Sequence, residues 1–276
     1  MQRENTTLRI DVGEVLSSKN SKLAKIIPNF VIAFLKRLVH QDEINDLLDR
    51  AGDKEGAEFI KAALERLRIS YTDSGFDKLD KSGRYIFASN HPLGGLDGMI
   101  LIKLITEKFG SVKVLGNDLI CHIKPISSLF VPVNKHGMQN RTIISEMNSV
   151  FESDTPVLYF PAGLCSRKKS GKICDLPWHK SFVSYALKFG RDIVPVHFSG
   201  KNSNRFYRSA NIRTALGIKF NYEMLLLPDE MFRQKGRSFE IKAGVPITYD
   251  NLKNSNKSAS QWAEDIKQAT YKLSTL

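Results

Sequence analysis

The sequence predicts an α/β protein in which a mixed, mostly parallel sheet is flanked by helices and preceded by an N-terminal helical hairpin. Short apolar segments with the length of buried strands alternate with longer segments whose apolar residues recur at helical spacing. A chain of 276 residues with 42% hydrophobic residues is long enough to bury a sizeable core. No internal repeat or low-complexity linker divides it. We therefore expect an N-terminal helical segment over residues 1–75 and one α/β domain over 76–276.

The positions of the strands and helices follow from these patterns. Strands are expected at 84–88, 112–115, 129–133, 156–160, 193–198, 221–227 and 238–243. Helices are expected at 98–109, 138–151, 178–189, 203–215 and 258–273. One face of the last helix carries Trp262, Ile266, Ala269 and Leu273, which predicts packing against the core.

The N-terminal hairpin is predicted from two apolar patterns. The run 26–35 is apolar, has Pro28 where a first helical turn would begin, and is flanked by lysine and arginine side chains. That pattern fits a helix lying on a membrane surface, and a run of this length fits equally well a helix packed in the protein core. The second helix has apolar residues at helical spacing and could pair with the first. Those residues are Phe59, Ile60, Ala63, Leu64 and Leu67.

The charge of the chain narrows its choice of partners. The net charge of +12 and the pI near 9.5 favour binding to polyanions such as nucleic acid, anionic lipid headgroups or an acidic carrier protein. No helix-turn-helix, zinc-finger or aromatic RNA-binding signature accompanies the charge, so we expect no nucleic-acid partner. An anionic membrane surface and an acidic carrier protein are the expected partners instead.

Cysteine usage and hydropathy indicate the compartment. Cys121, Cys165 and Cys174 are too few and too irregular for a disulfide framework or a structural zinc site, and we expect no bound metal. The first residues have no apolar signal-peptide core, and no run of 18 apolar residues occurs. We therefore expect a cytoplasmic protein held peripherally on the inner face of the cytoplasmic membrane.

The most informative stretch of the chain is the turn 89–98, which joins the expected strand 84–88 to the following helix. It places His91 and Asp97 on one strand-to-helix turn, where ligands of α/β sheets commonly bind. An imidazole can take a proton near neutral pH, and a carboxylate beside it fixes its tautomer. The pair could deprotonate a substrate hydroxyl. Alternatively, Asp97 caps the helix while Gly94 and Gly95 supply a tight turn.

Three later segments strengthen the catalytic interpretation. They are the strand-like runs 129–135 and 193–196 and, between them, the strand and Pro/Gly turn 157–167. In this order and spacing, together with 89–98, they resemble the four sequence blocks of the glycerolipid acyltransferase superfamily, the lysophosphatidic acid acyltransferase-like enzymes. The resemblance covers roughly residues 80 to 200.

The chain departs from the usual pattern of that family in three places. Five residues separate His91 from Asp97 where the family has four, so the glycine pair must absorb one residue. In the second block, Lys135 and Arg141 are the nearest candidates for the arginine that holds the acceptor's phosphate. In the third block, Ala162 stands where the family has a glutamate that contacts glycerol. With these departures the chain resembles the hemolysin-like branch, which includes O-acyltransferases that make bacterial aminolipids such as ornithine and glycine lipids.

The resemblance implies transfer of a fatty acyl group from an acyl carrier protein or coenzyme A thioester to the hydroxyl of a lysolipid, with no further cofactor. It implies that His91 is the general base and that Asp97 orients it. The glycine turn at Gly163 and the basic residues after it would cradle an anion, although such charge runs also form solvated loops. The substrate-binding residues expected from the motifs are Asn90, Gly94, Gly95, Lys135, Phe160, Pro161, Gly163, Ser166 and Arg167.

Other functions remain open from the sequence. A lyso-aminolipid is the expected acceptor, and 1-acylglycerol 3-phosphate is an alternative acceptor. A hydrolase or thioesterase could use the same histidine and aspartate on water, although no Gly-x-Ser-x-Gly elbow supports a serine hydrolase. A noncatalytic lipid-binding protein is a further alternative.

Overall fold

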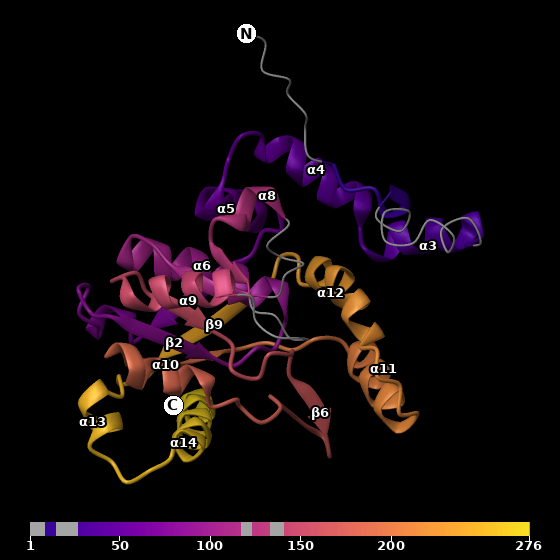
Figure 1. Ribbon diagram of the computed structural model, residues 1–276. Coiled ribbons are helices and arrows are strands. Elements are labelled where there is room, and N and C mark those ends of the chain that lie inside the picture. Colours follow the sequence, from indigo (N-terminus) through magenta and orange to yellow (C-terminus); the bar gives the residue numbers. More distant parts are fainter. Residues whose placement is uncertain (1–8, 15–26, 117–122, 133–140, 276) are drawn as a thin grey trace.

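A seven-stranded sheet organises the computed structural model, which describes residues 9–14, 27–116, 123–132 and 141–275 (Figure 1). The strand order is β1-β9-β8-β2-β5-β3-β4. The strands are β1 (Ser70–Ser74), β2 (Tyr85–Ser89), β3 (Lys113–Gly116), β4 (Phe130–Pro132), β5 (Val157–Tyr159), β8 (Asp192–Phe198) and β9 (Ser238–Ala243). A separate two-stranded hairpin consists of β6 (Arg167–Lys169) and β7 (Lys172–Cys174).

Five neighbouring strands run in one direction. β8, β2, β5, β3 and β4 pair in parallel, with Ile86 of β2 opposite Ile193 of β8 and Val157 of β5. β9 pairs antiparallel with β8, and β1 pairs in parallel with β9. The sheet is therefore mixed and mostly parallel, as predicted. The carboxyl ends of the five parallel strands meet at one edge, which is where ligands bind in sheets of this kind.

Helices cover both faces of the sheet (Figure 1). On β2, Phe87 packs into one core with α5 and α6, whereas Ile86 and Ala88 pack into another with α10 and α14. This alternation is the two-residue period of a strand buried on both faces. The helices are α3 (Asn29–Leu38), α4 (Gln41–Ala51), α5 (Gly56–Arg66), α6 (Gly95–Phe109), α8 (Lys124–Ser127), α9 (Arg141–Glu152), α10 (Ser181–Phe189), α11 (Asn204–Ala215), α12 (Leu227–Arg233), α13 (Tyr249–Lys253) and α14 (Ala259–Lys272), with the short 3₁₀ helices η1 (Phe76–Lys78), η2 (Tyr222–Leu226) and η3 (Leu273–Thr275).

The predicted strand over 221–227 is wrong, because the segment forms η2 and the start of α12. Its run of apolar residues is too short for periodicity to separate a strand from a helix. Pro228 occupies the first turn of α12, where proline is well tolerated. Buried Glu223 forms ion pairs with Arg167 and Arg213, and these ion pairs hold the segment against α11 and β6.

One strand and one two-stranded hairpin escaped prediction. β1 is polar, with exposed and half-buried residues alternating, and it becomes a strand by pairing with β9, far away in the sequence. It lies just before the boundary expected at residue 75. The basic run 167–172 forms a hairpin whose turn residues, Ser170 and Gly171, both have positive φ. Two such residues make the tight turn that suits the twist of a hairpin.

Between residues 27 and 75 the N-terminal segment has three helices, one more than the predicted hairpin. α5 buries Phe59, Ile60, Ala63 and Leu64 in the core. α4, which was not predicted, lies between α3 and α5 in the chain, and α3 buries no residue. At the junction of α3 and α4, the His40 ring stacks on Phe232 at 4.4 Å between centroids and lies 3.0 Å from an Asp229 oxygen. These contacts fix the N-terminal helices against α12.

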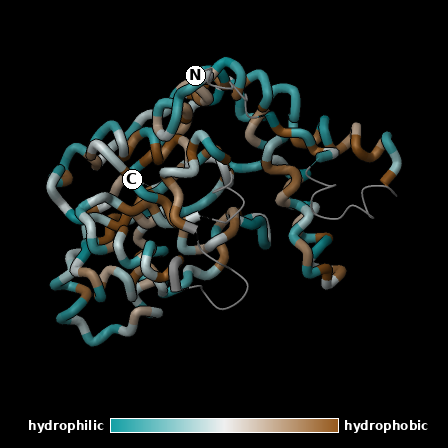
Figure 2. Tube along the Cα trace, turned by 45° about the horizontal axis from the view of Figure 1, so that its top comes forward, coloured by the Kyte–Doolittle hydropathy of each residue, from teal (hydrophilic) through white to brown (hydrophobic). Residues whose placement is uncertain are grey.

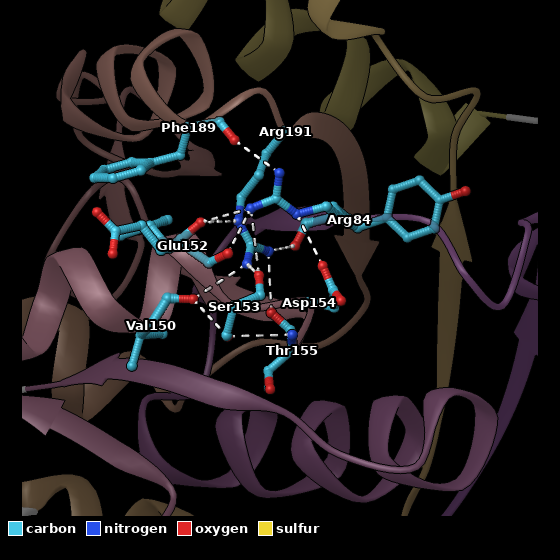
Figure 3. Close-up of polar contacts among 10 residues, drawn as sticks. Arg84, Val150, Glu152, Ser153, Asp154, Thr155, Phe189 and Arg191 are labelled. Carbon is cyan, nitrogen blue, oxygen red and sulfur yellow. Dashed lines mark hydrogen bonds and ion pairs between the residues drawn. The ribbon is translucent and has the colours of Figure 1, made fainter.

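At the amino edge of the parallel strands, two arginines hold the end of α9 (Figure 3). Arg191 is fully buried and donates to five backbone carbonyls, those of Tyr85, Val150, Phe151, Ser153 and Thr155. Arg84 donates to the carbonyls of Phe189 and Glu152 at 3.0 and 2.9 Å. The last carbonyls of a helix have no partner within the helix, and these guanidinium groups supply one. Burial lowers the pKa of Arg191 to about 10, so it remains charged at neutral pH.

Replacing Arg191 with methionine should therefore destabilise the fold. The change leaves buried carbonyls without donors, and hydrogen bonds to charged groups contribute about 1.5–3 kcal/mol each, so we expect a loss of roughly 3 kcal/mol or more. Urea unfolding followed by circular dichroism measures it. Arg208→Met, at an exposed position of α11, is the matched control and should leave the midpoint unchanged. Equal midpoints for the two variants would contradict the structural role of Arg191.

Candidate active site

The end of β2 is tied to the end of β8 by the side chain of Asn90. Its Nδ2 donates to the carbonyl oxygen of Phe198 at 2.9 Å, and its Oδ1 accepts from the Phe198 amide at 2.7 Å. The amide group is buried and continues the strand pairing by one step beyond the last backbone contact. Asn90 thus fixes where the chain leaves the sheet, directly before His91.

His91 and Asp97 meet across the turn that follows. Nδ1 of His91 lies 3.0 Å from Oδ1 of Asp97, whose side chain is fully buried. The Asp97 carboxylate also accepts from the amides of Leu93 and Gly98, at 2.8 and 2.7 Å. It lies in the first turn of α6, where the helix dipole stabilises a negative charge. The extra residue between His91 and Asp97 is accommodated in a turn whose Gly94 has a φ of 82°.

Phe160, from the end of β5, covers the imidazole of His91. The two ring centroids are 4.1 Å apart, with an angle of 31° between the planes. The His91 side chain retains 18% exposure, so it lies at the surface of an otherwise buried loop. The turn after Phe160 is closed by the amide of Gly163, which donates to the Phe160 carbonyl at 3.0 Å. The carbonyl of Pro161 accepts from the His179 amide.

Asp175 also holds the loop that carries His91, and the sequence analysis did not identify it. Its carboxylate accepts from the His91 amide at 3.3 Å, from Ser166 Oγ at 2.5 Å and from Trp178 Nε1 at 2.9 Å. The Ser166 amide in turn donates to the His91 carbonyl at 2.8 Å. Asp175 therefore joins the third motif to the first. Asp175 stands alone in the run Asp-Leu-Pro-Trp and belongs to none of the motifs, so the sequence carries no signal of this role.

Arg167 is positioned by the protein itself. Its side chain is only 7% exposed, and the guanidinium donates to the Cys165 carbonyl at 2.6 Å. The guanidinium also lies 2.9 Å from the carboxylate of Glu223, which forms a second ion pair with Arg213 at 2.8 Å. This buried network connects β6, η2 and α11. Arg167 is paired with Glu223, so the structure assigns it a contact inside the fold, and its expected contact with an anionic substrate stays a prediction.

The cysteine beneath the turn is no candidate nucleophile. Cys165 is fully buried, and burial raises its pKa to about 12. A thiol in this state remains protonated at neutral pH, and the thiolate is the reactive form. Within the described ranges, no group of three or more histidine, cysteine, aspartate or glutamate side chains could hold a metal ion.

The expected site residues thus divide into three groups. Asn90, Phe160 and Ser166 surround or support the loop that carries His91 and Asp97. Gly94, Gly95, Pro161 and Gly163 form the turns on either side of it. Lys135 and the side chain of Arg141 lie outside the described residues, so their expected contacts with the acceptor stay predictions.

Comparison with known proteins identifies relatives over nearly the whole chain. Residues 14–275 match the family described as acyltransferase. A protein of Bacteroides thetaiotaomicron named lyso-glycine lipid O-acyltransferase is 44% identical over 271 residues, covering 98% of this chain and 99% of the relative. A protein of the same name from Phocaeicola vulgatus is 41% identical, covering 98% of this chain and 97% of the relative. Among solved structures, the 1-acyl-sn-glycerophosphate acyltransferase of Thermotoga maritima is 17% identical with a TM-score of 0.44, covering 90% of this chain and 93% of that one.

The neighbouring glycines of the turn should respond differently to alanine. A Cβ at Gly94 would lie 3.0 Å from Leu227 and 3.1 Å from Cys165, and the positive φ adds backbone strain. We expect Gly94→Ala to lose roughly 1–3 kcal/mol of the free energy of unfolding. A Cβ at Gly95 meets nothing within 4 Å, so Gly95→Ala should be neutral or slightly stabilising. Urea unfolding compares the two, and equal losses would contradict this description of the turn.

Proposed function

This chain belongs to the acyltransferase family, and on that basis we propose that it transfers a fatty acyl group from an acyl carrier protein or coenzyme A thioester to the hydroxyl of a lyso-glycine lipid. The observation that carries the proposal is the approach of His91 to a fully buried Asp97 at the carboxyl edge of the sheet. The acceptor is inferred from the two relatives that bear that name and match almost end to end.

In the proposed reaction, His91 is the general base. Asp97, beside Nδ1, keeps the proton on that nitrogen, and Nε2 takes the proton of the acceptor hydroxyl. The acceptor oxygen attacks the thioester carbonyl and forms a tetrahedral intermediate. Its collapse forms the ester, breaks the carbon–sulfur bond and releases a thiolate, which takes the proton from the imidazolium. No covalent enzyme intermediate is needed.

The surroundings of His91 suit such a proton transfer. Phe160 covers one side of the ring, which limits water at the reacting centre. The loop is held by Asp97, Asp175 and Asn90 together, so the imidazole keeps its position without substrate. Preorganised geometry of this kind is what general-base catalysis requires.

Ala162 supports an acceptor without a phosphorylated glycerol. It is buried directly after Phe160 and Pro161 and stands where the resembling enzymes have a glutamate. A methyl group cannot accept a hydrogen bond from a glycerol hydroxyl. A hydroxyacyl-amide acceptor needs only placement of its hydroxyl near His91 and recognition of its carboxylate.

We also propose that the protein docks on the inner face of the cytoplasmic membrane. No helix in the described ranges is long and apolar enough to cross a bilayer. On α3, Phe30 and Phe34 are 74% and 61% exposed beside Lys36 and Arg37. A second exposed apolar cluster lies at the end of α11 and in the segment up to η2, on the same side of the molecule as α3 (Figure 2). Its members are Ile212, Leu216, Ile218, Phe220 and Leu225.

Replacing His91 with alanine should abolish acyl transfer while the protein stays folded. Loss of a general base typically lowers the rate by ~10²- to 10⁴-fold. Circular dichroism and urea unfolding check that the variant is folded. The assay measures ester formation from an acyl carrier protein thioester and a lyso-glycine lipid. Asp97→Asn should also be severe, and its unfolding is measured separately because Asp97 accepts two backbone amides. His179→Ala, at an exposed position, is the control. Near-normal turnover by folded His91→Ala protein would exclude the mechanism.

Binding to vesicles that contain anionic lipid should weaken as salt is added but should not vanish. Salt screens the contribution of the cations, and the apolar contribution of Phe30 and Phe34 remains. The double variant Phe30→Ser/Phe34→Ser should release the protein in a vesicle sedimentation assay. Val245→Ser, which removes an apolar side chain that is 85% exposed on another segment, is the control. Unchanged sedimentation of the double variant would refute docking through α3.

The acceptor preference follows from the missing glycerol contact. With one acyl donor, we expect kcat/KM to be higher for a lyso-glycine lipid than for lysophosphatidic acid, because the site lacks the glutamate acceptor at Ala162. Initial rates over a range of each acceptor measure the ratio. A clear preference for lysophosphatidic acid would show that the acceptor is wrongly assigned, and hydrolysis without an acceptor would instead indicate a thioesterase.

A further inference from the structure

A polar cavity of about 420 Å³ opens next to the loop that carries His91. Its walls come from four places that are distant in the sequence: the β6–β7 hairpin, the turn that starts α11, the end of α12 and the turn before β9. None of His91, Asp97 and Phe160 lines it. The cavity is therefore separate from the reacting atoms of the proposed site.

Four cationic side chains line this cavity: Lys168, Lys201, Arg233 and Arg237. Arg233 is paired with Asp229 at 2.8 Å, and Lys168 lies 3.2 Å from the amide oxygen of Asn204. In the described part of the chain, neither Lys201 nor Arg237 forms an ion pair with a carboxylate. Among the described residues, the walls thus hold two cations that are in direct contact with no carboxylate.

The carboxylate that lines the cavity is already occupied by the protein. Glu230 is 1% exposed and accepts from the amide and the hydroxyl of Ser203, at 2.6 and 2.5 Å. Ser203 is the N-cap of α11, a helix of 12 residues, so the positive end of the helix dipole lies at the cavity wall. A buried, doubly hydrogen-bonded carboxylate positions this wall and offsets only part of its positive charge.

The cavity is coupled directly to the His91 loop. Asn202 lines the cavity, and its Nδ2 donates to the carbonyl of Pro92 at 3.1 Å. Its amide donates to the hydroxyl of Tyr207, another lining residue, at 3.1 Å. A ligand that fills the cavity would therefore lie one side chain away from the residue next to His91.

We propose that this cavity binds a phosphate of the acyl donor, the phosphate that 4′-phosphopantetheine carries in both coenzyme A and acyl carrier protein. The inference rests on the proposed function. Lys and Arg side chains at a helix N-terminus form the environment that binds phosphate. Binding of this phosphate would also give a role to Lys168, which belongs to the basic run 167–172.

The separation of the cavity from His91 favours the donor over the acceptor. In a hydroxyacyl-glycine acceptor, the carboxylate is only a few bonds from the reacting hydroxyl, so its partner must lie at the reacting centre. In the donor, the whole pantetheine arm separates the thioester from the phosphate. The cavity shares no lining residue with His91 and Asp97, so an anion bound there lies apart from the reacting centre. That arrangement matches the long pantetheine arm of the donor.

The test compares three small donors: decanoyl-coenzyme A, decanoyl-4′-phosphopantetheine and decanoyl-pantetheine, which lacks phosphate. The acceptor is a saturating lyso-glycine lipid in detergent. In Lys201→Gln/Arg237→Gln, we expect KM for the two phosphorylated donors to rise about tenfold or more, as the loss of about 1.4 kcal/mol of binding free energy would produce. The value of kcat, the KM for decanoyl-pantetheine and the KM for the acceptor should stay within about twofold of the wild type, since only the phosphate contact is lost.

The control variant Lys81→Gln/Lys235→Gln removes the same charge from exposed positions outside the cavity and should match the wild type. An unchanged KM for the phosphorylated donors, or a raised KM for the acceptor alone, would overturn the inference. So would wild-type transfer from acyl carrier protein but from none of the small donors, because the carrier surface would then supply the binding. Wild-type protein that transfers from no thioester would instead refute the proposed function.

Discussion

The structure depends on holding the carboxyl group of Asp97 in a fully buried position beside an imidazole. A buried charge is costly unless it is paired and hydrogen-bonded. Asp97 meets that requirement with the amides of Leu93 and Gly98, the first turn of α6 and the ring of His91. Each of these contacts comes from the loop 91–98, so the loop can fold in only a narrow set of conformations. Gly94, with its positive φ, makes that conformation possible.

Buried carboxylates recur around this edge of the sheet, and each joins segments that are distant in the sequence. Asp175 joins the loop after β5 to the His91 loop. Glu223 joins β6 to α11 through Arg167 and Arg213. Glu230 joins α12 to the N-cap of α11. The loops at the carboxyl edge are thereby fixed to one another. A site assembled from several strand ends needs such cross-connections to keep its geometry.

Much of the fold could be predicted because its central strands are short apolar runs between clear helical patterns. β2, β5 and β8 have strong local signals of this kind. β1 could not be found, because its polar sequence becomes a strand only through pairing with β9. The segment 221–227 was misassigned for the opposite reason, since its apolar run carries no periodicity. Arg191 carries no sequence signal either, because its role depends on carbonyls from three other segments.

The candidate site was predictable to a similar extent. The approach of His91 to Asp97 followed from their shared turn, because a strand and the helix after it must meet there. The roles of Asp175 and of the cationic cavity depend on contacts between loops, and single-sequence patterns do not contain them. Arg167 was expected to face substrate because the glycine turn before it and the cations after it would complement an anion. Its burial requires Glu223, 56 positions later in the chain.

The proposed mechanism requires Asp97 to hold the imidazole of His91 with its proton on Nδ1, which leaves Nε2 to accept the proton of the acceptor. The ¹⁵N chemical shifts of histidine-labelled protein, recorded where the imidazole is neutral, report this directly. The His91 signals are assigned from their loss in His91→Gln. We expect the Nδ1–H tautomer in the wild type and loss of that preference in Asp97→Asn, because the carboxylate favours a proton on the nearer nitrogen. An Nε2–H tautomer in the wild-type protein would contradict the account.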